Sequence, residues 1–198
     1  MRQYTNGGVG FRPTILLPMT DLRYPDPGEP RFCARCGQPT ELVPRGGRLR
    51  PRCTACGWTY YAKNALGAAV AVLSDDRRSI LLVQRAHQPL AGWWMLPAGF
   101  VEYGEYAADT AVREAEEETG LQVELIGLRG LYFGTDDPRD VAHLAVYDAR
   151  VIGGTPTAGD DAAALGFFPA NALPTEIAFE GQRQAIRDWQ RQVQREAI

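Results

Sequence analysis

The sequence predicts an α+β protein in which a mixed β-sheet lies between helices, with a small four-cysteine zinc ribbon in front of it. Three observations predict this fold class: two C-x-x-C-G motifs near the N-terminus, apolar strand-like segments from residue 65 onward, and two segments with helical periodicity. We expect three parts along the chain, namely an extended N-terminal arm over residues 1–30, the zinc ribbon over 31–63 and one larger domain over 64–198.

The N-terminal segment 1–30 is rich in proline and glycine, a composition typical of an extended arm or linker. It lacks the long apolar stretch and small-residue cleavage site of a signal peptide. Nowhere does an apolar run approach the roughly 20 residues that a membrane-spanning helix needs. We therefore expect a cytoplasmic protein with no membrane partner.

All four cysteines lie in the two C-x-x-C-G motifs, which 16 residues separate. Paired motifs at this separation are typical of a tetrahedral zinc ribbon. Two disulfides are the alternative, but disulfides are rare in a cytosolic chain. We predict a structural Zn²⁺ site, because catalytic zinc keeps one position open and four thiolates leave none. The expected ligands are Cys33, Cys36, Cys53 and Cys56.

Three aromatic residues, Trp58, Tyr60 and Tyr61, follow the second cysteine motif. We expect them to pack where the ribbon meets the larger domain; a stacking platform for nucleic-acid bases is the alternative. The net charge of −3 gives no positive field of the kind that general nucleic-acid binding needs. We therefore expect a small-molecule partner rather than nucleic acid.

The larger domain begins with a predicted hairpin. Residues 66–73 are apolar and end at a Ser-Asp-Asp turn, and residues 79–85 supply the antiparallel partner. Further strands are expected at 94–97, near 121–134 and near 141–151.

Two helices are predicted in the same domain. The first ends near Thr119, because Gly120 suits the left-handed conformation that commonly ends a helix. The second covers residues 181–195, where Ile186, Trp189 and Val193 recur at spacings of three and four and form one apolar face. We expect this second helix to close the sheet.

The first helix has an acidic face formed by Glu114, Glu117 and Glu118, at positions i, i+3 and i+4. Like charges at this spacing destabilise a helix by roughly 0.2–0.5 kcal/mol per pair. A hard divalent cation removes the conflict, because Mg²⁺ and Mn²⁺ take oxygen ligands and keep positions open for phosphate. The alternative is a solvated acidic face. Small residues form the opposite, packing face: Ala108, Ala111, Val112 and Ala115.

The residues around these glutamates favour the cation site over a solvated acidic face. The run GFVEYGEYAADTAVREAEEETGL, residues 99–121, agrees at every fixed position with G-x5-E-x7-R-E-U-x-E-E-x-G-U, where U is aliphatic or small. It resembles the signature of the Nudix hydrolases, which cleave nucleoside diphosphates linked to another moiety. The resemblance implies an α/β/α sandwich around a mixed sheet, and a hydrolase that depends on Mg²⁺ or Mn²⁺.

The resemblance also implies roles for single residues. Glu114, Glu117 and Glu118 resemble the family's catalytic metal ligands, and the carbonyl of Gly99 is a further candidate ligand. Arg113 resembles the arginine that orients a neighbouring glutamate, with an exposed cation as the alternative. Glu105 resembles the glutamate that supports the motif loop, and its alternative is a favourable charge at a helix N-terminus.

The general base stays open at this level. In some Nudix enzymes it lies in the motif, and in others it comes from a later loop. Asp136 and Asp137 lie in one polar loop, and Asp160 and Asp161 precede the Phe-Phe-Pro stretch at 167–169. Each is also an ordinary turn residue.

Zinc ribbons in front of a Nudix motif resemble two groups. The NADH and NAD-cap pyrophosphatases usually carry an S-Q-P-W-P-F-P segment after the motif helix, of which residues 127–134 show no trace. The second group combines the ribbon with an L-P-A-G loop, as at 96–99, and a tail like L-P-T-E-I-A-F at 173–179, and includes enzymes acting on ADP-ribose and FAD.

We therefore expect an ADP-linked pyrophosphate, ADP-ribose or FAD, as substrate, with NADH or an NAD cap as the alternative. A non-catalytic nucleotide-sensing or RNA-binding module is the alternative of another class. Many Nudix enzymes are dimers, so a homodimer is compatible with the resemblance. Candidate substrate-binding residues are Trp93, Tyr132, Phe133, Asp136 and Phe179.

Overall fold

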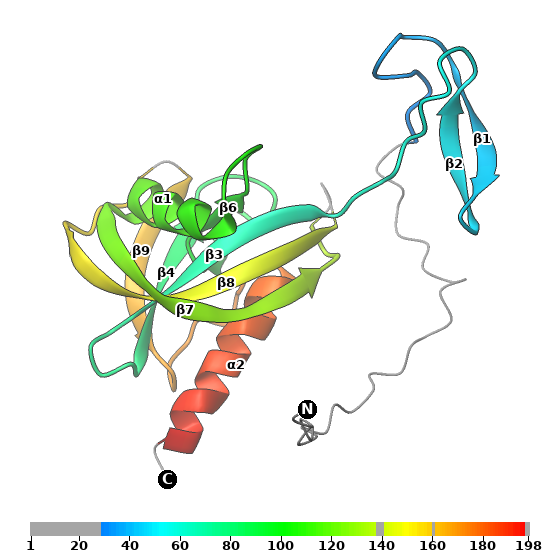
Figure 1. The fold of residues 1–198 in the computed structure, drawn as a ribbon. Coiled ribbons are helices and arrows are strands. Elements are labelled where there is room, and N and C mark those ends of the chain that lie inside the picture. The colour runs from blue at the N-terminus through cyan, green and yellow to red at the C-terminus, as the bar shows by residue number, and fades with distance from the viewer. Residues whose placement is uncertain (1–28, 138–140, 160, 197–198) are drawn as a thin grey trace, which may run out of the picture.

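The computed structural model describes residues 29–137, 141–159 and 161–196. It shows a two-stranded hairpin followed by a seven-stranded mixed sheet with helix α1 on one face and helix α2 on the other (Figure 1). The predicted fold class is confirmed. The expected arm over residues 1–30 lies almost entirely outside the described residues. Neither described helix combines the length and the apolar composition that crossing a bilayer requires.

The main sheet has the strand order β5-β4-β3-β8-β7, with β6 paired to β3 and β9 paired to β4. Strands β3 and β8 are parallel, and the other pairs are antiparallel. The sequence did not predict the strands β6 and β9. The strands are β3 (Ala65–Leu73), β4 (Ser79–Arg85), β5 (Trp94–Met95), β6 (Ala98–Phe100), β7 (Leu121–Gly134), β8 (Ala142–Gly154) and β9 (Ala162–Pro169).

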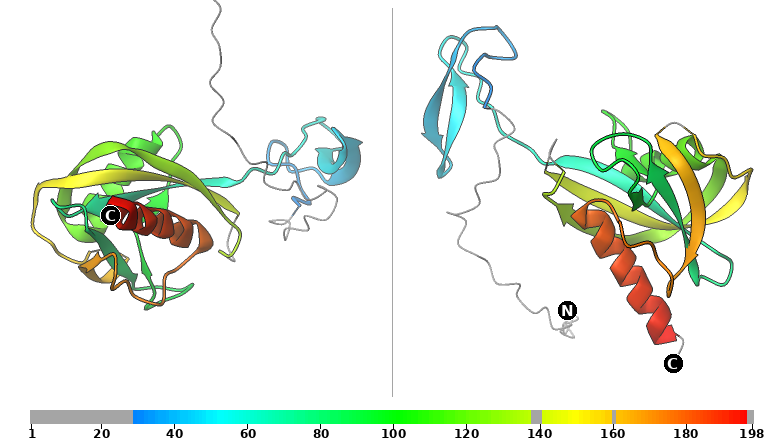
Figure 2. Two further views of the ribbon diagram at one scale, coloured as in Figure 1. Left: turned by 90° about the horizontal axis from the view of Figure 1, so that it is seen from below. Right: turned by 180° about the vertical axis from the view of Figure 1, so that it is seen from behind.

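Each face of the sheet supports an apolar layer beneath one helix. Figure 2 shows the sheet and the two helices from two further directions. On one face, Val70 and Val72 of β3 pack with Ala111 and Ala115 of α1 (Ala107–Thr119). On the other face, the alternate residues of β3 pack with Ile186 and Trp189 of α2 (Glu180–Glu196). Because successive side chains of a strand point to opposite faces, the central strand β3 anchors both helices. The apolar faces predicted for the two helices face the sheet: Ala111, Ala115, Ile186 and Trp189 are buried, and Ala108, Val112 and Val193 are half-buried.

Helix α1 ends where the sequence predicts. Gly120 adopts the left-handed conformation with φ of 67°, and its N–H donates to the carbonyl of Glu116 over 2.8 Å. A Cβ at Gly120 would lie 2.7 Å from the carbonyl oxygen of Thr155. Glycine is therefore required here both by the backbone angle and by the close approach of the chain after β8.

The motif loop reaches the sheet through a split in strand pairing. Strands β3 and β4 are in register at Leu73 and Ile80, next to their turn. Toward the other end of β3, β6 takes the neighbouring position and pairs Ala68 with Gly99. This split places Gly99 against the central strand and beneath α1.

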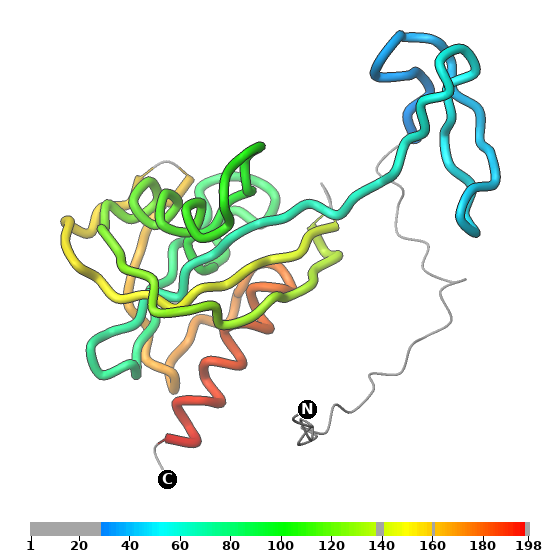
Figure 3. Tube along the Cα trace, in the orientation of Figure 1, coloured from blue at the N-terminus to red at the C-terminus, as the bar shows by residue number. Residues whose placement is uncertain are grey.

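The N-terminal hairpin consists of β1 (Thr40–Arg45) and β2 (Arg48–Cys53). A connection follows it and leads into β3 at Ala65, and in the tube drawing the hairpin lies beyond the start of that strand (Figure 3). Asn64 of this connection lies 3.1 Å from the Nε2 atom of His143 in β8. The boundary between ribbon and larger domain near residue 63 remains a prediction.

Candidate active site and cysteine cluster

A pocket of about 350 Å³ opens beside the motif loop. Its volume lies within the range that small-molecule sites commonly have, roughly 300–1,000 Å³. Gly99 and three residues of α1 line it together with the loop after β7 and the N-terminal end of α2. The predicted site residues in its lining are Gly99, Arg113, Glu114, Glu118, Asp136 and Phe179.

The carboxylate of Glu114 lies directly against the backbone of Gly99. A Cβ built on Gly99 would lie 1.9 Å from Oε1 of Glu114, far closer than any two such atoms approach. The absence of a side chain at position 99 therefore leaves the space that the carboxylate occupies. The backbone of the motif loop and the first acid of the helix thus meet at one point of the pocket wall.

Arg113 balances three of the acids in the structure. Its guanidinium donates to Glu105 over 3.0 Å, to Glu114 over 2.7 Å and to Glu117 over 2.8 Å. The hydrogen bond from Arg113 is the main reason that the pKa of Glu105 falls to about 2. Glu105 also accepts the N–H of Glu102 over 3.1 Å, so its carboxylate connects the motif loop to the helix. Arg113 therefore serves as the counter-charge of the acidic cluster.

Glu118 is the buried acid of the site, with 6% of its surface exposed. Desolvation raises its pKa to about 8, although the N–H of Ala98 donates to its Oε2 over 3.1 Å and acts in the opposite direction. The charges of Glu114 and Asp161 add to the rise. Desolvation also raises the pKa of Glu114. Two neighbouring carboxyl groups that are costly to ionise are a favourable setting for a bound cation.

Glu117 lies apart from the other two predicted ligands. Its side chain is 42% exposed, it is absent from the pocket lining, and its carboxylate pairs with Arg113. Within the described part of the chain, the cysteine thiols are the group of possible ligand atoms that lie within 4.8 Å of one another. The three glutamates therefore share a helix face, as the spacing requires, but their carboxylates are not gathered around one point.

The donor set of the pocket nevertheless fits a hard divalent cation. Gly99 offers a backbone carbonyl, and Glu114 and Glu118 offer carboxylate oxygens on the same wall. Oxygen donors of these kinds are those that Mg²⁺ and Mn²⁺ prefer. Glu117 would join such a set only after its carboxylate left Arg113.

The acids of the later loops differ in their surroundings. Asp136 accepts the N–H of Glu180 over 2.8 Å and forms an ion pair with Arg183, so its carboxylate caps the start of α2. Asp137 and Asp161 line the pocket, and Asp161 lies 3.7 Å from Nε2 of His87. Asp160 is outside the described residues. Asp161 is thus the later-loop acid whose charge acts on Glu118.

Of the aromatic candidates, Phe179 lines the pocket. The guanidinium of Arg85 lies 5.0 Å from the centre of the Phe179 ring. Trp93, Tyr132 and Phe133 do not line the pocket. Trp93 packs beside Val83 and Met95.

Tyr132 and Phe133, the other two aromatic candidates, are engaged away from the pocket. Tyr132 packs against the α2-side core, and burial raises its pKa to about 12. Phe133 lies against His143, with ring centres 5.0 Å apart. Strand alternation in β7 directs these rings to the two sheet faces rather than to the site.

The sequence analysis missed several pocket residues, among them Arg85 and Gln182. Gln182 is 3% exposed, and its Oε1 accepts the N–H of Leu96 over 3.2 Å. The signal for Gln182 is its position in the apolar stripe of α2, four residues before Ile186, where a polar residue needs a buried partner. Arg85 gives a weaker signal, since a charged residue at the end of a buried strand is common.

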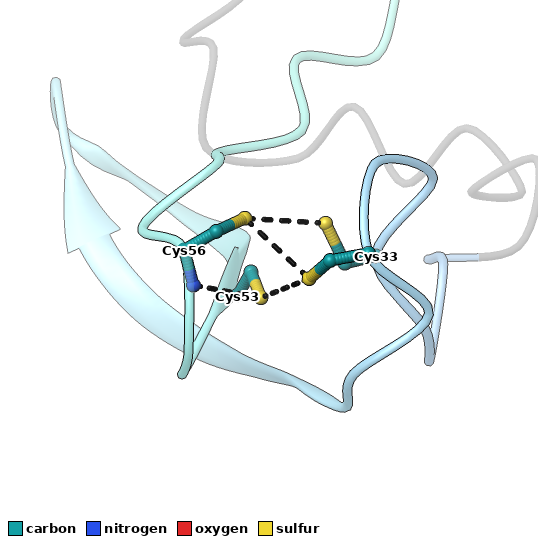
Figure 4. Close-up of side chains that lie close together, drawn as sticks. Cys33, Cys53 and Cys56 are labelled. Carbon is teal, nitrogen blue, oxygen red and sulfur yellow. Dashed lines mark hydrogen bonds between the residues drawn. The ribbon is translucent and has the colours of Figure 1, made fainter.

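The four cysteines form a compact cluster in the ribbon, and three of them are labelled in Figure 4. The sulfur of Cys56 lies 3.6 Å from those of Cys33 and Cys36, and the sulfurs of Cys36 and Cys53 are 3.5 Å apart. A tetrahedral ion about 2.3 Å from each sulfur would separate them by about 3.8 Å. The thiols are free rather than disulfide-bonded, and the predicted clustering is confirmed.

Backbone N–H groups support this cluster. Arg35 donates to the sulfur of Cys33, and Cys56 donates to that of Cys53, each over 3.4 Å. The N–H of Cys56 is the main reason that the pKa of Cys53 falls to about 6, against the effect of desolvation. Donors that favour a thiolate fit the cluster for Zn²⁺, whose sulfur ligands are deprotonated.

Comparison with known proteins adds family evidence to this geometry. The model of the NUDIX domain matches residues 63–189, which is more than half of the chain. The ADP-ribose pyrophosphatase of Methanocaldococcus jannaschii is 42% identical over 129 residues, covering 64% of this chain and 75% of that protein. The NAD-capped RNA hydrolase NudC of Haemophilus influenzae is 33% identical over 127 residues, covering 62% of this chain but 46% of that protein.

Solved structures show the same fold. The crystal structure of a NUDIX hydrolase from Nitrosomonas europaea superimposes with a TM-score of 0.73 at 24% identity, covering 83% of this chain and 93% of the other.

Proposed function

Because this chain belongs to the NUDIX domain family and is a hydrolase of that family, we propose that it hydrolyses the pyrophosphate bond of an ADP-linked compound. The observation that supports this most directly is the position of the motif. The 23-residue motif between Gly99 and Leu121 lines the pocket with Gly99, Arg113, Glu114 and Glu118, so the acids and the cavity belong to one site.

The proposed site uses a divalent cation held by the Gly99 carbonyl, Glu114, Glu117 and Glu118. Such a cation neutralises phosphate oxygens and makes a water molecule a better nucleophile toward phosphorus. Glu114 rests on Gly99, so its carboxylate is positioned before substrate arrives. Glu118 is held by the N–H of Ala98. The cluster therefore has two fixed acids and a more exposed third, Glu117, that can approach.

Arg113 and Glu105 act as positioning residues in this proposal. In the structure Arg113 takes up the negative charge of Glu105, Glu114 and Glu117. When Glu117 turns toward a cation, the bond between Arg113 and Glu105 keeps the arginine beside the helix. Glu105 meanwhile retains its bond to the N–H of Glu102 in the loop. Of the later-loop acids, Asp161 is the better candidate for a base, because the carboxylate of Asp136 is committed to α2.

ADP-ribose and FAD are the proposed substrates. The 42% identity to an ADP-ribose pyrophosphatase supports this choice, and so does the phenyl ring of Phe179 in the pocket wall, which offers an apolar face to an adenine. The NAD cap of RNA is the second candidate, favoured by the identity of 33% to NudC. The chain spans less than half of that protein, so the cap activity is the weaker proposal.

A substrate panel tests the proposal. ADP-ribose, FAD, NADH, NAD-capped RNA, diadenosine polyphosphates and nucleoside triphosphates are each incubated with Mg²⁺ or Mn²⁺, and the products are separated. We expect AMP from ADP-ribose or FAD at the highest kcat/KM. Glu116→Gln is the matched control for Glu117→Gln, since Glu116 lies exposed between the site acids. Release of no AMP from any pyrophosphate, with the zinc content intact, would reject the activity.

A further inference from the structure

The register of the ribbon hairpin gathers its arginines on one side. Strands β1 and β2 pair Arg45 with Arg48, Val43 with Arg50 and Glu41 with Arg52. Cross-strand partners share a face of a hairpin, and residues two apart on one strand share it as well. We call the resulting surface the arginine face, after its four arginines Arg45, Arg48, Arg50 and Arg52. Val43 and Glu41 lie on the same face, and Glu41, which stands opposite Arg52, forms no ion pair among the described residues.

An aromatic ring belongs to the same face. The chain after the second cysteine motif runs beside β2, where Arg52 forms a bridge with Thr59 and the N–H of Tyr60 donates to Pro51 over 2.8 Å. Tyr61 follows, and the guanidinium of Arg50 lies 4.6 Å from the centre of its ring. Tyr61 is 46% exposed. The expectation that it packs against the larger domain is therefore not met, because its ring lies under Arg50 within the ribbon.

The guanidinium groups of the arginine face have no carboxylate partner among the described residues. The ion pairs of the described part of the chain do not include any of the four arginines. Arg50 donates to the carbonyl of Arg45 over 3.3 Å and contacts Tyr61. Like charges opposite each other, such as Arg45 and Arg48, destabilise a hairpin. A face of this kind gains most from an external polyanion.

The charge of the chain is segregated by region. Residues 29–63 contain seven lysine and arginine residues against two glutamates, whereas residues 64–198 contain eleven cationic against twenty acidic residues. Four thiolates with one Zn²⁺ add two negative charges to the ribbon and leave it positive. The net charge of −3 is therefore the sum of a positive ribbon and a more strongly negative larger domain, so it does not show that the ribbon itself is positive.

We propose that the arginine face, with Tyr61, binds a single-stranded nucleic acid. Arginine forks match phosphate oxygens in paired hydrogen bonds, and an exposed aromatic ring stacks on an unpaired base. A partner recognised by charge alone, such as an acidic protein segment, does not make use of the tyrosine ring. A duplex does not offer an unstacked base to it. This binding is separate from the hydrolysis proposed above and uses no residue of the pocket.

Fluorescence anisotropy tests the proposal with the zinc-loaded full chain and a labelled 12-nucleotide RNA that has a 5′-hydroxyl. The log of the binding constant is expected to fall with the log of salt concentration with a slope of about −3, because each of four phosphate contacts contributes about 0.7. The RNA contains no pyrophosphate, so failure to bind is distinct from failure to hydrolyse ADP-ribose. Single-stranded DNA of the same sequence tests whether the face prefers RNA or DNA. Binding to either supports the proposal.

The double variant Arg45→Gln with Arg48→Gln removes two charges from the arginine face. Among the residues that the structure describes, no side-chain hydrogen bond or ion pair involves these two guanidinium groups, so the fold is expected to be retained, as zinc content verifies. The slope should fall to about −1.5 and the affinity on the order of tenfold at low salt. The matched control is Arg78→Gln with Arg195→Gln, two exposed arginines of the larger domain, which should leave RNA binding unchanged.

Tyr61→Leu separates stacking from charge. It should weaken RNA binding at least about fivefold while leaving the binding of heparin, a polyanion without bases, unchanged. Should Arg45→Gln with Arg48→Gln lose zinc, the lysine pair Arg45→Lys with Arg48→Lys replaces it and should keep most of the salt slope. Equal RNA binding by wild type and the glutamine pair overturns the proposal. So does equal affinity for a duplex, or displacement of the RNA by oligoglutamate at equal concentration, which would identify an acidic protein partner.

Discussion

The ribbon and the larger domain position their proposed metal ligands in opposite ways. In residues 29–63 the buried side chains include two of the four cysteines, and no helix accompanies the hairpin. In the larger domain, apolar layers on both faces of the sheet fix α1 before any cation is considered. The comparison teaches that Zn²⁺ would be part of the fold of the ribbon, whereas the proposed divalent cation would serve only the reaction in the larger domain.

Counter-charges show the same difference. The acids of α1 are balanced by Arg113, so the site is electrostatically tolerable without a cation. The thiols of the ribbon have backbone N–H groups but no basic side chain among their hydrogen-bond partners in the described residues. We expect removal of Zn²⁺ to unfold the ribbon. Removal of the divalent cation should stop hydrolysis but leave the larger domain folded.

Among the predicted changes, removal of zinc should have the largest effect on structure. A ribbon that stays folded without zinc would contradict the comparison between the two regions. Zinc contributes roughly 10–16 kcal/mol to the folding of zinc-finger peptides, more than a hairpin of this size can replace. With Cys36→Ser or a strong chelator, we expect loss of zinc and proteolysis within residues 31–63, while kcat on ADP-ribose stays within about twofold. Limited proteolysis, zinc analysis and kinetics measure this. Immediate loss of activity that only Zn²⁺ restores would contradict the structural role.

Glu117→Gln should have the next largest effect. The substitution removes one anionic ligand from the proposed cation site, and loss of one preorganised electrostatic group commonly lowers kcat about 10²- to 10³-fold. Because the side chain is half-exposed, the thermal midpoint should change little. Glu116→Gln carries the same change of charge on the same helix and should retain activity. Unchanged kcat of Glu117→Gln at saturating Mg²⁺ would remove Glu117 from the site.

Gly99→Ala sharpens the comparison by adding one methyl group at the pocket wall. Its Cβ would overlap Oε1 of Glu114, so the carboxylate must turn away. We expect the Mg²⁺ concentration for half-maximal activity to rise about tenfold or more and the thermal midpoint to fall by a few degrees, about 1 kcal/mol. Gly127→Ala is the control, since no atom lies within 4 Å of the added Cβ. Equal metal dependence of both variants would contradict the proposed role of Gly99.

Glu118→Gln has the smallest expected effect, on stability, and it depends on pH. The pKa of Glu118 rises to about 8 in the folded state, from an ordinary 4.5, because of desolvation. The folded state therefore holds a proton that the unfolded state has lost, and stability falls as pH rises from about 4.5 to 8. The neutral amide removes this loss. We expect the metal-free variant to melt a few degrees above wild type at pH 9 and about equally at pH 5.

Differential scanning calorimetry across this pH range measures the effect. Glu116→Gln, an exposed substitution on the same helix, should follow the wild-type profile. Parallel profiles for wild type and Glu118→Gln would show that the carboxyl group of Glu118 is ionised in the folded protein.

The fold could be predicted from the sequence where one local pattern decides. The apolar run of β3, the stop of α1 at Gly120 and the stripe of Ile186, Trp189 and Val193 are confirmed. Strand β9 was missed because its Ala-Ala-Ala-Leu-Gly start has no alternation, and pairing with β4 rather than local propensity forms it.

The site shows the same limit. The spacing of Glu114, Glu117 and Glu118 shows a shared helix face, but not that Arg113 pairs with two of them and with Glu105. The rotamer of Arg113 among the neighbouring acids is decided by three-dimensional packing, which the spacing of residues in the sequence does not encode. The task of Asp136 as a cap of α2 depends on contact between distant segments and is likewise invisible in sequence. In the ribbon, the strand register identifies the proposed arginine face, which the total charge of the chain does not show.

The parallel pairing of β3 with β8 has a consequence for synthesis of the chain. Ala65 of β3 pairs with Ala142 of β8, so the centre of the sheet cannot close until most of the protein has left the ribosome. The four cysteines lie within residues 33–56 and need nothing that follows them. A nascent chain should therefore bind zinc and fold its ribbon early, while the larger domain is still unfolded.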